Sequence, residues 1–257
     1  MKGRSRSSSI QTKRSKAAQW GTREPEWTQA LVLQELKSLA DPAVRAKMAY
    51  LGVDAPKAHG ISTPVLHGLA RQIGKNHSLS RELWKTGFHE ARILATLIGE
   101  PERVTEMEME QWARDFDSWD LVDAACCYLY AQARPAWKKA ESWSRRREEF
   151  AKRAAFSLMA YLAYKDKAAS DGQFRRLLTI IEREAHDERN FVRKAVNWAL
   201  RNIGKKNKRL NREAIRAAER IRKQGTSSAR WIAADALREL KSPAVRARVS
   251  RKKPGKT

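Results

Sequence analysis

The 257-residue chain has few of the features that mark secreted and membrane proteins. Its two cysteines, Cys126 and Cys127, are adjacent and cannot easily bridge each other. Both lie in an apolar helical run, so we expect buried thiols rather than a disulfide or a metal site. No apolar run has the length of a membrane span, and the N-terminus lacks the apolar segment of a secretion signal. We therefore expect a cytoplasmic protein without a membrane partner.

Patterns for metal and cofactor sites are also missing. His59 and His67 are eight residues apart, and His186 with Asp187 has no third ligand near it. A two-His-one-carboxylate iron set cannot be assembled from this chain. There is no Gly-rich phosphate loop and no Ser/His/Asp arrangement. We expect any chemistry to need no metal and no cofactor.

Acidic residues are few in comparison with basic ones. Lys and Arg number 53 against 29 Asp and Glu, a formal net charge of +24. Residues 1–16 carry six basic residues and no acid, and residues 241–257 carry seven and no acid, which leaves +11 on residues 17–240. Such an excess indicates a polyanionic partner, most often a nucleic acid, although an anionic membrane surface would satisfy the same balance.

Signals for β-strands are lacking, because period-two alternation and clusters of β-branched residues are rare. Helical apolar stripes occur instead, for example over residues 25–39, 63–73 and 89–98, and Asp41-Pro42 starts another helix. We expect an all-α protein. Its predicted parts are a disordered basic arm (1–22), a folded domain (23–240) and a basic C-terminal tail (241–257).

The C-terminal half contains a weak internal repeat. The segment from Phe150 resembles the segment from Phe191, 41 residues later, and a looser copy begins at Ala229. Helical repeats of about 40 residues are typical of HEAT-type helix pairs, which stack into a curved superhelix. Basic residues recur at similar places in each unit and would form a track for a phosphate backbone on the concave face: Lys152, Arg153, Arg193, Lys194 and Arg230.

The stretch from Phe116 to Asp123 has the pattern of a helix start. Asp117 or Ser118 would serve as the N-cap, and Asp120 would lie in the first turn, where the helix dipole favours an anion. Trp119 and Asp123 are four residues apart and therefore share one face of the helix. An indole beside a carboxylate is an unusual pairing for a buried face.

Several motifs in this order resemble the AlkD family of HEAT-like DNA glycosylases, which remove alkylated bases. The resemblance spans about residues 30–240. It is carried by these segments: Gly60-Ile61-Ser62-Thr63-Pro64, Leu83-Trp84, His89-Glu90-Ala91-Arg92, Ser118-Trp119-Asp120 with Asp123, Lys152-Arg153-Ala154-Ala155, and Phe191-Val192 with Lys194-Ala195, Trp198 and Leu200-Arg201.

The resemblance implies roles for individual residues. Trp119 and Asp123 match the family's catalytic tryptophan and aspartate, Trp198 its second cleft tryptophan, and Arg153 its cleft arginine. Tyr50 matches a family tyrosine if a gap of one residue is allowed. The implied activity is excision of cationic N3- and N7-alkylated purines from duplex DNA without base flipping. We also expect a monomer, because repeat folds of this type need no partner to close their core, and association with the nucleoid through DNA binding.

Each of these residues also has a structural interpretation. Trp119 and Trp198 could be core aromatics, and Asp123 could be a surface acid or an arginine's partner. We expect other tryptophans, such as Trp84, Trp143 and Trp231, to pack between helices. The alternative function is therefore a non-catalytic helical-repeat protein that binds nucleic acid or scaffolds other proteins.

Overall fold

A computed structural model describes residues 27–53 and 55–251 and is all-helical throughout that part of the chain. The all-α prediction is confirmed, while the predicted arm at 1–22 lies outside the described residues. The α-helices are α1 (Gln29–Ser38), α2 (Pro42–Tyr50), α3 (Thr63–Ile73), α4 (His77–Lys85), α5 (His89–Ile98), α6 (Glu106–Ala113), α7 (Trp119–Ala124), α8 (Ala136–Trp143), α9 (Glu149–Lys165), α10 (Asp171–Glu184), α11 (Asn190–Gly204), α12 (Lys208–Arg222), α13 (Ser227–Leu240) and α14 (Pro243–Ser250).

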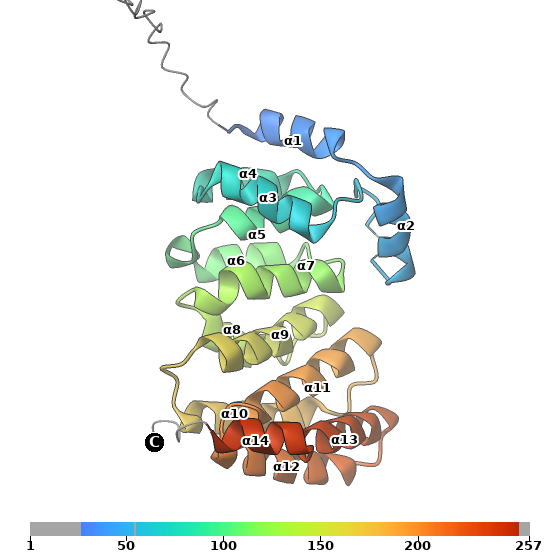
Figure 1. The fold of residues 1–257 in the computed structure, drawn as a ribbon, viewed down its shortest axis with the longest axis vertical. Helices are drawn as coiled ribbons and strands as arrows, with labels where there is room; N and C mark the ends of the chain where they lie inside the picture. The colour runs from blue at the N-terminus through green and yellow to red at the C-terminus, as the bar shows by residue number, and fades with distance from the viewer. Residues whose placement is uncertain (1–26, 54, 252–257) are drawn as a thin grey trace, which may run out of the picture.

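The helices form a stack that runs from α1 at one end to α12, α13 and α14 at the other (Figure 1). Successive helices pair, as α4 does with α5, α8 with α9 and α12 with α13. One row of helices continues along the stack, because α7 packs on α9, α9 on α11 and α11 on α13. The internal repeat predicted from the sequence therefore corresponds to α9, α11 and α13, which begin at Glu149, Asn190 and Ser227.

Small residues allow these helices to approach closely. Along α9 the buried positions include Ala154, Ala155 and Ala160, which present little more than a methyl group to neighbouring helices. Several helices begin at a residue whose side chain accepts hydrogen bonds from the first backbone N–H groups of the helix. Asp41 accepts hydrogen bonds from the backbone N–H groups of Ala43 and Val44 at the start of α2. The predicted helices at 63–73 and 89–98 are confirmed.

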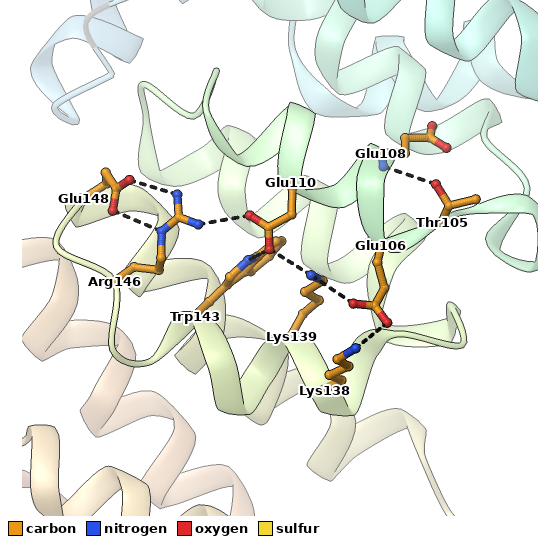
Figure 2. Close-up of polar contacts among 9 residues, drawn as sticks. All are labelled: Thr105, Glu106, Glu108, Glu110, Lys138, Lys139, Trp143, Arg146 and Glu148. Atoms are coloured by element: carbon orange, nitrogen blue, oxygen red, sulfur yellow. Dashed lines mark hydrogen bonds and ion pairs between the residues drawn. The ribbon is translucent and has the colours of Figure 1, made fainter.

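A polar network joins α6 to α8 and reaches the start of α9 (Figure 2). Glu110 accepts hydrogen bonds from Lys139, from the Trp143 indole N–H and from Arg146, at 2.8, 2.7 and 2.9 Å. Arg146 also holds Glu148, the residue that precedes α9, and this hydrogen bond lowers the pKa of Glu148 to about 2. The network therefore connects the N-terminal end of α9, the helix that carries Arg153, to α6 and α8.

The folded region continues past residue 240, where the sequence predicted a tail. Helix α14 packs on α12 and α13 and buries Val245 and Val249, which are four residues apart on one face. The expected boundary was too early because three arginines and a lysine obscured this short apolar stripe. Within the described residues, no helix is long and apolar enough to cross a membrane.

Candidate functional site

Helix α7 is the short element that carries the first two site residues. Ser118 precedes it, and its hydroxyl donates to Asp117 instead of capping the helix backbone. Asp120 lies in the first turn, as predicted, and its carboxylate is 2.9 Å from the buried His89 ring. The Trp119 indole N–H donates to the carbonyl of Leu51, at the end of α2, at 3.1 Å. This bond ties α7 to the N-terminal end of the stack.

Asp123 lies one turn after Trp119 and holds two hydrogen bonds. The guanidinium of Arg153 donates to its Oδ2 at 2.8 Å, and the Ser157 hydroxyl donates to its Oδ1 at 2.8 Å. Burial raises the pKa of the Asp123 carboxyl above its usual value, and the charge of Arg153 offsets this only in part. The carboxylate is thus partly desolvated but still borders the cavity described below.

Arg153 joins three helices through its side chain. Besides Asp123 on α7, it donates to the carbonyl of Phe191 on α11 at 2.9 Å, and its guanidinium carbon lies 6.0 Å from the centre of the Trp119 ring. Only 6% of Arg153 is exposed. The phosphate contact expected from the sequence therefore competes with an ion pair already made inside the protein.

Trp198 extends from α11 into the same region. Its ring meets Tyr161 of α9 edge-on, with centroids 4.9 Å apart. The indole is half-buried and not sealed in the core. The tyrosine therefore holds one side of Trp198 while another side borders open space.

These side chains converge on a cavity of about 500 Å³ along the row α7, α9, α11 and α13. Its lining is aromatic and charged: Leu51, Trp119, Asp123, Arg153, Phe191, Lys194, Asn197, Trp198, Arg201, Trp231 and Asp235. Five of the predicted site residues are in this set, namely Trp119, Asp123, Arg153, Lys194 and Trp198. Lys194 is exposed, so its ammonium group is accessible to an anion in the groove.

Lys152 lies elsewhere, and the expectation that it lines the groove is wrong. Its ammonium group is 2.6 Å from Glu184 and 2.9 Å from Asp187, and only 7% of the residue is exposed. Consecutive residues on a helix point about 100° apart, and here Lys152 points to Glu184 and Asp187 while Arg153 points to the groove. The ion pair contributes to lowering the pKa values of both carboxyl groups against the effect of burial.

Tyr50 and Arg193 lie beside the cavity and are not among the residues that line it. Tyr50 is the last residue of α2 and is 89% exposed, whereas the next residue, Leu51, borders the cavity. Arg193 stacks on Trp231, with its guanidinium carbon 5.4 Å from the ring centre.

Six lining residues were not predicted as site residues: Leu51, Phe191, Asn197, Arg201, Trp231 and Asp235. Trp231 was expected to pack between helices, as Trp84 and Trp143 do, but it is 40% exposed and borders the groove. Asp235 and Arg201 lie near it. The signal that could have revealed Trp231 and Asp235 is their spacing of four residues, the same as that of Trp119 and Asp123. Across the described residues, no three His, Cys, Asp or Glu side chains lie close enough together to hold a metal ion.

A family model described as DNA alkylation repair enzyme matches residues 32–240. The chain belongs to this family. The match covers the helices from α1 to α13 and includes every residue of the groove. No curated protein sequence matches the chain significantly.

A solved structure supports the fold of this DNA alkylation repair family member. It is described as belonging to a new family of proteins related to the HEAT-like repeat DNA glycosylases with affinity for branched DNA structures. The two chains are 21% identical, with a TM-score of 0.72, and the match covers 88% of this chain and 98% of the other. The predicted stack of HEAT-like helix pairs is thereby confirmed.

Proposed function

We propose that the chain is a DNA glycosylase that hydrolyses the N-glycosidic bond of cationic N3- and N7-alkylated purines in duplex DNA. The observation that carries the proposal is the Asp123 carboxylate, which borders a groove together with Trp119 and Trp198. A protein that only bound a phosphate backbone would gain nothing from this negative charge, which repels phosphate. A reaction that develops positive charge would gain from it.

The proposed reaction begins from a base that already carries a positive charge. As the glycosidic bond breaks, its electron pair leaves with the neutral alkylpurine and positive charge grows on the deoxyribose. The Asp123 carboxylate stabilises that charge and accepts a proton from the water that adds to the sugar carbon. The indole faces of Trp119 and Trp198 add about 0.5–2 kcal/mol for each favourable contact with the cation. An unmodified, neutral purine leaves too slowly to be excised.

Arg153 takes a different role in this proposal from the one expected from the sequence. Its hydrogen bonds to Asp123 and to the Phe191 carbonyl orient the carboxylate, so Arg153 acts as a positioning residue. The phosphate groups of the DNA would then be bound by exposed cationic side chains at the groove, in particular Lys194.

The experiment is a base-release assay on an oligonucleotide duplex with one 7-methylguanine. We expect wild-type protein to convert this position to an abasic site, which alkali cleaves to a single shorter product. Matched duplex with guanine should stay intact. An absence of product at excess protein, under conditions where the duplex is fully bound, would overturn the proposal.

A second candidate is a protein that binds branched DNA without cleaving any bond. The similar structure described above belongs to proteins with such an affinity, and Arg153 here neutralises the one carboxylate on which catalysis would depend. This function predicts tighter binding to a three-way junction than to a linear duplex, with no release of base from either.

A further inference from the structure

The groove contains a second tryptophan–aspartate pair, formed by Trp231 and Asp235 of α13. These residues are four apart, like Trp119 and Asp123, and both pairs line the same cavity. In both pairs the indole contacts an arginine, and the carboxylate contacts an arginine and a neutral hydrogen-bond donor; in the first pair Arg153 makes both arginine contacts and Ser157 is the donor. For the second pair these partners are Arg193, Arg201 and Asn197.

The partners of the second pair make it richer in cations than the first. The Asn197 amide donates to Asp235 at 2.7 Å, and the guanidinium of Arg201 is 3.4 Å away. Arg238 forms a further ion pair with Asp235. Asp123, in contrast, forms an ion pair with a single arginine, Arg153, among residues 27–53 and 55–251. A carboxylate paired with two guanidinium groups is poorly suited to stabilise a cation, so the second pair does not duplicate the proposed catalytic one.

Trp231 nevertheless keeps an accessible indole. It is 40% exposed, while Arg193 covers part of it at 5.4 Å from the ring centre. Arg193 forms no ion pair with a carboxylate among the described residues, and its buried Nε has no hydrogen-bond partner. An open aromatic face beside an uncompensated guanidinium is the combination that binds a nucleotide, because the base stacks and the phosphate pairs with arginine.

We propose that Trp231 and Arg193 form a second subsite at the edge of the groove, which takes an unpaired nucleotide of the bound DNA. Its base stacks on the Trp231 indole, and its phosphate pairs with Arg193. Asp235 positions this wall of the groove through Asn197 and Arg201. The proposal rests on the proposed function only in that DNA occupies the groove, and it does not require bond cleavage.

The test compares two duplexes of the same sequence, one fully paired and one with a single bulged 2-aminopurine. We expect wild-type protein to bind the bulged duplex about tenfold more tightly and to quench the probe through stacking. Trp231→Ala should bring the ratio of the two dissociation constants close to one, whereas Trp231→Phe should retain most of the preference. Tyr164→Ala is the control, because Tyr164 is exposed and does not line the groove.

An equal affinity of the wild type for both duplexes would overturn the subsite, as would a preference that survives in Trp231→Ala. Base release is measured separately on the same preparations. A bulge preference without base release leaves the subsite standing and removes the glycosylase proposal. Base release without a bulge preference leaves the glycosylase proposal standing and removes the subsite.

Discussion

Asp123→Asn is the substitution that most sharply separates catalysis from binding in this groove. Asparagine has nearly the same shape. Its one amide oxygen can still accept the hydrogen bond from Arg153, and its NH2 group can donate to the Ser157 hydroxyl oxygen, so the local packing should persist. What it removes is a negative charge. A sugar cation about 4 Å from the carboxylate is attracted by about 4 kcal/mol at an effective dielectric constant of about 20.

The Arg153 guanidinium opposes this attraction. It lies on the carboxylate, and a cation about 8 Å from it is repelled by about 2 kcal/mol at the same dielectric constant. Because Arg153 stays in place in Asp123→Asn, its repulsion is the same in both proteins and cancels in the comparison. The loss is therefore the full attraction of about 4 kcal/mol, or roughly a thousandfold in rate. Loss of the group that accepts the proton from water would add to this figure.

The assay is single-turnover base release with protein in excess, after subtraction of spontaneous depurination. We expect Asp123→Asn to lose roughly a thousandfold in rate and to keep its affinity for duplex DNA. Asp117→Asn is the matched control, because Asp117 is an exposed acid just before α7 that does not line the groove. A rate for Asp123→Asn within threefold of the wild type, on the order of experimental scatter, would refute the assignment.

Three further predictions concern charge. Lys152→Met should lower the free energy of unfolding by about 1–3 kcal/mol, measured by urea titration. Glu184 and Asp187 lose their shared buried cation but keep Arg183 and Arg189 as partners; an unchanged stability would contradict the contribution of the ion pair. Lys194→Gln should weaken DNA binding and reduce the slope of log affinity against log salt by about 0.9, whereas an unchanged slope would remove its phosphate contact. In the proposed mechanism base release requires ionised Asp123, and burial raises the pKa of that carboxyl above about 3.9, the value of an ordinary aspartate. The rate of base release should therefore fall on acidification with a midpoint above that pH. A midpoint of the pH–rate profile below about 3.9 would contradict the effect of burial.

The His89–Asp120 pair, which joins α5 to α7, should stabilise the fold only within a limited pH range. Burial alone would lower the pKa of His89, but the hydrogen bond and charge of Asp120 raise it. The pKa of Asp120 is lowered, since the contact with His89 outweighs the effect of burial. The stabilisation is therefore lost as pH rises through the raised pKa of His89, and also as pH falls through the lowered pKa of Asp120. His89→Gln should flatten the pH dependence of thermal stability above about pH 6.5, and an unchanged profile would contradict this coupling.

Much of the fold could be predicted because local signals and the repeat agree. Asp41-Pro42 and Thr63-Pro64 mark helix starts by their own chemistry, and the period of about 40 residues identifies α9, α11 and α13 as equivalent helices. Helix α14 was missed because a stripe of only two valines among arginines has the composition of a tail. Its burial depends on packing against α12 and α13, which the composition of residues 241–257 does not reveal.

The site was predictable where spacing alone decides which residues share a face. Trp119 and Asp123 are such a pair. The sequence did not predict which carboxylate each basic residue pairs with. Lys152 and Arg153 are neighbours in sequence, yet they point to different sides of α9. The carboxylates that draw Lys152 inward come from the end of α10 and the loop after it, more than 30 residues later. Tertiary contacts of this kind carry no local signal.

The most direct measurement is mass spectrometry of the free purines released from DNA treated with a methylating agent. The account predicts that wild-type protein releases 7-methylguanine or 3-methyladenine above the spontaneous level, that Asp123→Asn does not, and that neither releases adenine or guanine. Equal purine release with and without the wild-type protein, while the same DNA is bound, would contradict it.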